Sequence, residues 1–513
     1  MVKRYFVAAL TLLFAWLPSQ TEANKAPLGK KGTPNIIYIV ASGLGFDDLS
    51  YYGQSVIETP NLDALAREGM VFTNYYMGQA TDVASRYSLL TGMHGGHAYI
   101  RGNDEMEERG DIWNYRAMLG DSTLEGQRPL PHGTVMIPQK LKEAGYVTAY
   151  MGKWGLGYPG SESTPNKMGF DSFYGYNCQR QALTYYPPFL YRDERRVYLN
   201  NQFLEPGTGL DPNADAQDPL NYVKYAAQDY APEKIYLEAL RFVRQRKEET
   251  FALFWASPLP DGALQVPEKW LTYYIDKMGD EAPFLGNRRF SPCRYPKATY
   301  AAMVSFFDEQ VGELVDLLKE LGIYDNTLLV LTGGNRVTNE ACAAELNVYR
   351  SSFSLKAGGS EKVTLSEDKL HAPMIVSWPK EIKTGATSDI LTTSWDVMAT
   401  LCDLVKVEAP LTDGISWLPV LRGKQRKQKA HEFLYWENAE LDGEIALRMG
   451  IWKAYVGDVM KGNRQVRLFD LSVDPNEHLD VAEQHQDVVA QVLRYIEKSH
   501  RSPSLKIFDF PTW

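Results

Sequence analysis

Short, continuous apolar runs that alternate with amphipathic segments are the strongest constraint on how this chain can fold. Residues 35–41 read NIIYIVA, residues 251–256 read FALFWA and residues 327–332 read TLLVLT. The first run is rich in β-branched residues, and continuous apolar runs of this length are typical of strands buried on both faces of a parallel sheet. The longest helical pattern covers residues 300–321. The alternation predicts an α/β fold with a large mixed, mostly parallel sheet sandwiched by helices.

The same two patterns recur before and after these segments. We expect helices at 60–68, closed by Gly69, and at 137–144, and strands at 71–76, 146–151 and 372–378. Residues 200–228 are polar and rich in Pro, Gly and Asp, which is typical of an irregular loop.

The pattern changes after Arg422. Strands expected at 431–436, 446–455 and 465–471, with a helix at 488–500, predict a small antiparallel sheet closed by a helix. We therefore expect an α/β domain over residues 34–421 and a C-terminal α+β subdomain over residues 430–513.

The first residues have the pattern of an export signal. Lys3 and Arg4 precede an apolar run from Tyr5 to Leu17, and a small-residue cleavage pattern ends near Ala23. The run is short for a membrane span, although an uncleaved anchor is the alternative. We predict a signal peptide over residues 1–23, a periplasmic or secreted protein, and a mature chain that does not span a membrane.

The net charge and the cysteine content limit the kinds of partner and metal site that the sequence predicts. The formal net charge is −10, so the basic footprint of a nucleic-acid-binding protein is absent. The basic stretch 422–429 (RGKQRKQK) is interpreted as a solvated linker. The four cysteines show no metal-ligand spacing and are interpreted as buried free thiols, with disulfide pairing left open. They are Cys178, Cys293, Cys342 and Cys402.

Several longer motifs together resemble the sulfatase family of the alkaline-phosphatase-like superfamily. They include NIIYIVASGLGFDDLSYYG, TPNLDALAREGMVFTNYY, ASRYSLLTGMHGGHAYIRGN, LKEAGYVTAYMGKWGLG and LFDLSVDPNE, in the family's order along the chain. GKWGLGYPGS and GYNCQRQA are similar to a bacterial branch of arylsulfatases and N-acetylgalactosamine-6-sulfatases. The resemblance implies the family's α/β fold and a sulfate-ester site.

The resemblance also implies a defined chemistry. A sulfatase attacks the ester with a formylglycine made from Cys or Ser, and a divalent cation, usually calcium, binds that nucleophile and a sulfate oxygen. Hard cations require several oxygen ligands, preferably carboxylates, and the cation stabilises the developing charge. Lys, Arg and His side chains bind the remaining sulfate oxygens.

The positions that the resemblance assigns to the metal are altered. The first strand runs into Ser42 and Gly43 where two Asp ligands are implied, and the second pair, Asp-Asn in the family, is Gly334-Asn335. Asp47 and Asp48 follow the first strand, but the match over LGFDDLSYYG places them beyond the ligand positions.

The nucleophile motif is altered as well. The family pattern of Cys or Ser, any residue, Pro, any residue, Arg corresponds here to residues 82–86, DVASR. Asp82 cannot become formylglycine, and Ala84 replaces the Pro. Ser85 is expected to lie in the first turn of the following helix, and Arg86 is retained.

Among the sulfate-binding positions, the family's His becomes Asp261 in PDGALQVP, and a Lys-Trp-His pattern reads Lys153-Trp154-Gly155. The Gly form of that pattern also occurs in the similar bacterial branch. The Lys that precedes a further family turn corresponds to Lys362. The resemblance therefore leaves four anion-binding candidates: Arg86, Lys153, Asn335 and Lys362.

These substitutions lead to an electrostatic hypothesis. Three positive side chains would crowd together without a metal-nucleophile centre, so we expect Asp82 to form an ion pair with Arg86 and Lys153. A dication held mainly by Asn335 and Asp82 should bind poorly, and we expect neither a metal nor formylglycine as a cofactor. Calcium is expected only if the site is active.

The leading hypothesis is a catalytically inactive sulfatase homologue whose cleft binds sulfated or anionic glycans, or whose basic residues merely neutralise Asp82 and Asp261. The alternative is an active sulfuric-ester hydrolase, or a related phospho-hydrolase, with a rebuilt site. Asp82 would then be a nucleophile, or a general base beside His94 or His97, two residues otherwise interpreted as structural hydrogen-bonding groups. A third hypothesis is a scaffold or partner subunit, for which the sequence specifies no protein partner.

Overall fold

A ten-stranded sheet forms the centre of the fold in the computed structural model, which describes residues 33–335, 363–440 and 442–510. Its strands lie in the order β11 (Ala386–Ser388), β2 (Met70–Phe72), β10 (Met374–Ser377), β9 (Thr327–Gly333), β1 (Asn35–Ala41), β8 (Phe251–Ser257), β4 (Val147–Lys153), β5 (Ser172–Tyr176), β6 (Phe189–Arg192) and β7 (Arg195–Tyr198).

The central strands β9, β1, β8, β4 and β5 are all parallel to their neighbours. Antiparallel pairs occur where β10 lies between β9 and β2, and where β6 lies between β5 and β7. The central strands are buried along nearly their whole length, as their continuous apolar sequences predicted. The expected mixed, mostly parallel sheet is therefore confirmed.

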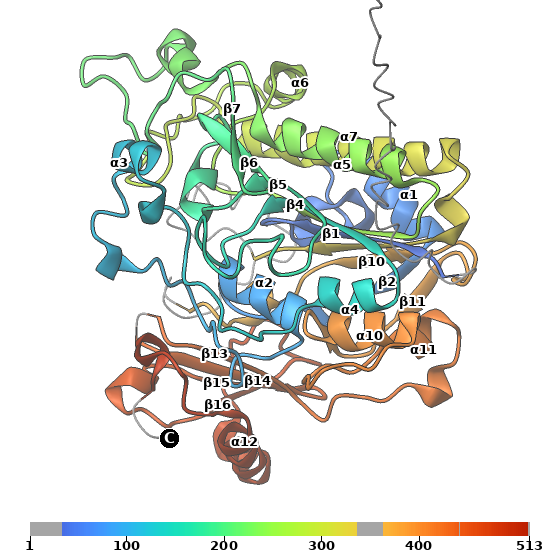
Figure 1. The fold of residues 1–513 in the computed structure, drawn as a ribbon. Coiled ribbons are helices and arrows are strands. Elements are labelled where there is room, and N and C mark those ends of the chain that lie inside the picture. Colours follow the sequence, from blue (N-terminus) through green and yellow to red (C-terminus); the bar gives the residue numbers. More distant parts are fainter. Residues whose placement is uncertain (1–32, 336–362, 441, 511–513) are drawn as a thin grey trace, which may run out of the picture.

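Helices cover both faces of this sheet (Figure 1). One face carries α1 (Pro60–Glu68), α5 (Ala231–Arg246), α6 (Glu268–Met278) and α7 (Pro296–Glu320), and the other α2 (Asp82–Thr91), α4 (Ile137–Glu143), α10 (Asp396–Val405) and α11 (Leu418–Leu421). Along β1, Ile37 and Ile39 join the apolar core under α7, whereas Ile36 and Tyr38 join the core under α2. The period-2 alternation of a strand thus supplies both cores.

A separate antiparallel sheet follows near the C-terminus, as predicted. It consists of β13 (Leu434–Asn438), β14 (Glu444–Met449), β15 (Trp452–Val456) and β16 (Arg467–Asp470), and α12 (Gln486–Ser499) packs with it. Glu437 on β13 is buried between Arg101 and His500, and Trp436 Nε1 donates to Met77 O at 2.8 Å. The exact division at residues 421 and 430 stays a prediction.

Two expected strands are each divided in the structure. The segment 71–76 forms β2 and β3 (Tyr75–Tyr76), and β3 pairs instead with β12 (Thr392–Thr393). Asn74 separates the two because its side chain donates to Asp389 O at 2.7 Å. The segment 446–455 forms β14 and β15, since Gly450 adopts a left-handed φ of 55° and turns the chain.

The described residues contain no helix that is both long and apolar enough to cross a membrane. Cys178, Cys293 and Cys402 are buried free thiols. Cys342 and the expected signal peptide lie outside the described residues.

Gly152 offers a test of how tightly β4 packs against β8. Its φ is +132°, and an added Cβ would lie 1.9 Å from Ala256 O on the neighbouring strand. We expect Gly152→Ala to lower the free energy of unfolding by about 3 kcal/mol, because it adds both a steric clash and backbone strain. Urea unfolding followed by circular dichroism measures the change.

Gly160→Ala is the matched control, since Gly160 has a φ of +83° but open space around its Cβ position. It should cost only about 1 kcal/mol of backbone strain. Equal losses in the two variants would contradict the close strand approach at Gly152.

Candidate active site

The ends of four central strands bring the candidate residues together. Carboxyl ends of parallel strands meet at one edge of a sheet, which is where ligands bind in open α/β folds. Ala41, the last residue of β1, is in register with Ser257 of β8 and Gly333 of β9. The residues at this edge are Ser42 and Gly43 after β1, Lys153 at the end of β4, Asp261 after β8, Gly334 and Asn335 after β9, and Asp82 at the start of α2.

Lys153 is the centre of this group. Its Nζ donates to Asp82 Oδ2 at 2.8 Å and to Asp261 Oδ2 at 2.7 Å. The lysine side chain is 5% exposed, whereas those of Asp82 and Asp261 are 28% and 30% exposed. A single buried ammonium group thus bridges two partly exposed carboxylates, one at the start of α2 and one in the loop after β8.

The pKa values of the pair shift as this bridge requires. Burial would raise the pKa of Asp82, but the charges of Lys153 and Arg86 outweigh it and hold the pKa below its ordinary value. Burial would lower the pKa of Lys153, but the carboxylates of Asp261 and Asp82 raise it above its ordinary value. Both groups are therefore charged at neutral pH.

Arg86 behaves differently from the expectation that it would pair with Asp82. Its Nη1 donates to the backbone oxygen of Trp154 at 2.5 Å, and it acts on Asp82 through its charge. The side chain is buried on α2, one turn after Asp82. The direct ion pair joins Asp82 to Lys153, as expected, and the second partner of Lys153 is Asp261, which the sequence suggested only as a charge that the basic residues of the site neutralise.

Asn335 is tied to the turn that precedes α2. Its Nδ2 donates to Gln79 O at 2.7 Å, and Ser85 Oγ donates to the same oxygen at 2.7 Å. Ser85 thus lies in the first turn of α2 with a structural hydrogen bond, as expected. The Oδ1 atom of Asn335 is buried and has no hydrogen-bond partner among the described residues. Lys362 lies outside the described residues.

The residues present do not fit a hard divalent cation. Calcium takes six to eight oxygen ligands, and carboxylates dominate its sites. Here Asn335 Oδ1 is one free amide oxygen, one oxygen of Asp82 is engaged by Lys153, and the side chains at Ser42, Gly43 and Gly334 carry no carboxylate. Asp48 does not replace these missing carboxylates. It accepts hydrogen bonds from Gly45 N at 2.7 Å and from Tyr300 Oη at 3.0 Å.

The backbone has also closed around one former ligand position. Gly334 N donates to Ala41 O at 2.7 Å, and a Cβ at Gly334 would lie 2.9 Å from that oxygen and 2.9 Å from Ser42 Cα. An Asp at this position would require the chain ends of β1 and β9 to separate.

A cavity of about 40 Å³ lies behind Lys153. This volume has room for a few water molecules at most and none for a sugar ring. Its polar lining consists of Tyr38, Ser42, Tyr75, Asp82, Ser85, Arg86, Tyr150, Lys153, Ser257, Thr332, Asn335 and Ser394.

Within the described ranges, one group of His and acidic side chains lies close enough to share a metal ion: His94, His97 and Asp413. His97 Nδ1 lies 2.7 Å from Asp413 Oδ1, and burial lowers the pKa of His94 to about 4. Because His94 Nδ1 accepts from Gly96 N at 3.1 Å, neutral His94 carries its proton on Nε2 and offers no lone pair there. The hydrogen bonds of His94 with Gly96 N and of His97 with Asp413 fit the structural role expected of both histidines.

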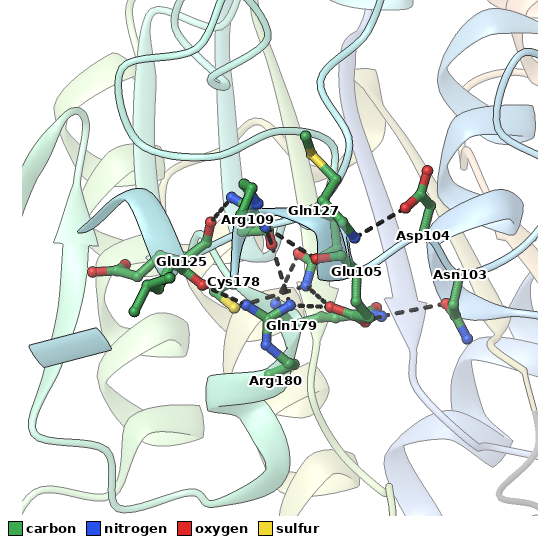
Figure 2. A network of polar contacts seen from close by, with 12 residues as sticks. Asn103, Asp104, Glu105, Arg109, Glu125, Gln127, Cys178, Gln179 and Arg180 are labelled. Atoms are coloured by element: carbon green, nitrogen blue, oxygen red, sulfur yellow. Dashed lines mark hydrogen bonds and ion pairs between the residues drawn. The ribbon is translucent and has the colours of Figure 1, made fainter. Parts of the chain in front are cut away.

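A polar network that the sequence did not reveal is centred on Glu105 (Figure 2). A Cβ at Gly155 would lie 3.2 Å from Arg86 Nη1 and 3.4 Å from Gln127 Oε1. Gln127 Nε2 donates to Glu105 Oε2 at 2.7 Å, and Gln179 Nε2 donates to Glu105 Oε1 at 2.8 Å. Only the GYNCQRQA motif hinted at Gln179, and no spacing signal links these three distant segments.

Comparison with known proteins agrees with this architecture. The family model described as Sulfatase matches residues 34–407, which is well over half of the chain. The chain belongs to the sulfatase family. A second model, described as N-sulphoglucosamine sulphohydrolase, C-terminal, matches residues 358–502.

Individual relatives cover nearly the whole sulfatase chain. The N-acetylgalactosamine-6-O-sulfatase of Bacteroides thetaiotaomicron is 28% identical, over 90% of this chain and 92% of that protein. The crystal structure of Ps i-CgsB has a TM-score of 0.69 at 23% identity and covers 92% and 94% of the two chains. A protein solved with its substrate D-glucosamine-2-N,6-O-disulfate has a TM-score of 0.65 at 19% identity, covering 91% and 98%. At such identities the structures support the fold.

Removing the bridging ammonium tests its role in this sulfatase. Lys153→Met leaves two carboxylates facing each other, and we expect a loss of about 2–3 kcal/mol in the free energy of unfolding. The partial exposure of the carboxylates keeps the loss below that of a fully buried pair. Adding Asp82→Asn and Asp261→Asn to Lys153→Met should recover more than half of it.

Lys167→Met is the control, because Lys167 is more exposed and lies 3.8 Å from Glu162. It should change the free energy by less than about 0.5 kcal/mol. If Lys153→Met is as mild as Lys167→Met, the bridge is not the main charge contact of the site.

The pH dependence of stability has a definite sign. The pKa of Asp82 is lowered from 3.8, so its stabilisation is present above pH 3.8 and is lost as pH falls through the folded value. The pKa of Lys153 is raised from 10.5, so its stabilisation is present below pH 10.5 and is lost as pH rises further. The unfolding free energy of the wild type minus that of the triple variant should therefore be flat between these limits and fall outside them. A difference that grows with acid would contradict the bridge.

Proposed function

We propose that this sulfatase-family protein binds an anionic, sulfated carbohydrate without hydrolysing it. The observation that carries the proposal is the Lys153 bridge. Its two carboxylates lie at the positions where the resemblance implies the nucleophile and a sulfate-binding His. A negatively charged ester would meet Asp82 and Asp261 before it met the ammonium group between them.

The charge of the pocket supports this proposal. Among the described residues of the site, Asp82 and Asp261 carry two negative charges, and Arg86 and Lys153 carry two positive ones. These balance, so the pocket lacks the surplus positive charge that binds and activates a sulfate ester. Asp82 also cannot provide the aldehyde hydrate of formylglycine, which removes the activated nucleophile.

The carbohydrate half of the proposal rests on the relatives. The Bacteroides relative is named for N-acetylgalactosamine 6-O-sulfate, and a structural neighbour was solved with a disulfated glucosamine. Export to the periplasm or the outside of the cell, proposed from residues 1–23, would place the protein where such polysaccharides occur.

A second candidate function is an active sulfuric-ester hydrolase with a rebuilt site, or a related phospho-hydrolase. Relatives that match this chain over most of its length are named as sulfatases, which favours this candidate. In that case Asp82, at the first turn of α2 and beside Lys153, is the residue placed to act as nucleophile or base.

One assay separates the two candidates. Release of sulfate from an aryl sulfate and from N-acetylgalactosamine 6-sulfate is measured with added calcium and with chelator, and the melting temperature is recorded in both. We expect no turnover and no shift in melting temperature, because the site offers too few oxygen ligands for calcium. The Bacteroides relative is the positive control.

Calcium-dependent turnover that disappears in Asp82→Ala would favour the second candidate and end the non-hydrolytic proposal. Turnover that survives Asp82→Ala would indicate a contaminating sulfatase, which a repeat with the same protein from an independent purification identifies.

A further inference from the structure

The neutral pocket leaves open which groups would hold a carbohydrate. The cavity behind Lys153 is too small for a sugar ring, so the ring must contact residues outside it. Gly155 lies beside both the pocket residue Arg86 and Gln127 of the Glu105 network, so this network forms the wall next to the pocket. Residues of this wall are therefore candidates for contact with a sugar ring.

Arg180 makes this wall rigid. Its side chain is 1% exposed, and its Nη1 forms an ion pair with Glu105. Its Nη2 donates to Leu124 O at 2.7 Å. These contacts fix the guanidinium group (Figure 2), so a side chain that packs against it is also held in a defined position.

Trp113 is the side chain that packs against the Arg180 guanidinium. The Arg180 guanidinium is centred 5.6 Å from the Trp113 ring, yet 38% of the Trp113 surface is exposed. Large exposed aromatic side chains held by buried groups are typical of binding surfaces. Trp113 comes just before α3 (Tyr115–Gly120), whose N-terminus is capped by Asn114 accepting from Ala117 N at 2.9 Å.

Arg289 supplies a cation at the same place. Its guanidinium lies 6.0 Å from the centre of the Trp113 ring, the residue is exposed, and no described carboxylate forms an ion pair with it. Burial raises the pKa of Glu440, and the backbone N–H of Asn103 and the charge of Arg289 oppose that rise without cancelling it. Arg289 therefore keeps its charge available for a ligand.

We propose that Trp113 and Arg289 form a subsite for one pyranose ring of an acidic glycan, with the apolar face of the ring on the indole and its sulfate or carboxylate on the guanidinium. This proposal rests on the proposed function and names where its ligand binds. Stacking of sugar C–H groups on an indole and ion pairing to Arg suit these two side chains.

The other charges nearby are largely paired. Asp104 and Glu108 form ion pairs with Arg128, Glu105 with Arg180, and Glu125 with Arg196. Two exposed acids of the same loop, Glu107 and Asp111, have no ion pair among the described residues. Their charge opposes the binding of an anion, so we expect binding to be stronger for ligands with a sugar ring than for free sulfate.

The test is calorimetric binding of a chondroitin 6-sulfate tetrasaccharide and of its unsulfated counterpart to the full chain. Trp113→Ala should weaken binding of both by about tenfold, because the stacking surface is lost. Arg289→Gln should weaken only the sulfated ligand, by about fivefold, and by less at high salt. Inorganic sulfate should bind much more weakly than either tetrasaccharide.

Matched controls are Tyr273→Ala on α6 and Arg241→Gln on α5, because Tyr273 is 40% exposed and the Arg241 side chain is 60% exposed. Both should bind like the wild type. If the wild type binds and Trp113→Ala binds equally well, the subsite is wrong while the proposed function stands. If the wild type binds no tetrasaccharide at all, the carbohydrate half of the proposed function fails first.

Discussion

One buried ammonium group, held between two carboxylates, determines both the charge of this site and the function that we propose for it. Lys153 lies at the end of a central strand, and Asp82 and Asp261 reach it from the start of a helix and from a loop. A buried lysine is costly unless its charge is satisfied, and two acceptors at hydrogen-bond distance satisfy it. The same contacts neutralise the place at which a sulfatase concentrates positive charge, so stability and loss of hydrolysis have one physical cause in this proposal.

The fold makes that contact possible and could be predicted well from the sequence. Continuous apolar runs such as residues 35–41 and 327–333 specify buried parallel strands, and the carboxyl ends of such strands meet at one edge. The predictions failed where a single polar residue or glycine interrupts a run. Asn74 and Gly450 each divide one expected strand in two, because a side-chain hydrogen bond or a left-handed turn outweighs the apolar pattern.

The candidate site was only partly predictable. Aligned motifs placed Asp82, Arg86, Lys153 and Asn335 at one site, and the structure brings them to one small cavity. The contacts between these groups were predicted only in part: Asp82 pairs with Lys153 as expected, but Arg86 bonds to Trp154 O, and the second partner of Lys153 is Asp261. The wall made by Glu105, Gln127 and Gln179 joins three distant segments, and no periodicity or spacing records such a contact.

The central claim is that a dication does not bind where the side chains of Ser42, Gly43 and Gly334 provide no carboxylate. Elemental analysis of the purified protein, loaded with calcium and then exchanged into metal-free buffer, tests this most directly. We expect the exchanged protein to contain no stoichiometric calcium, magnesium or other divalent metal. One metal ion per chain that is lost when Asp82 or Asn335 is replaced by Ala would contradict it.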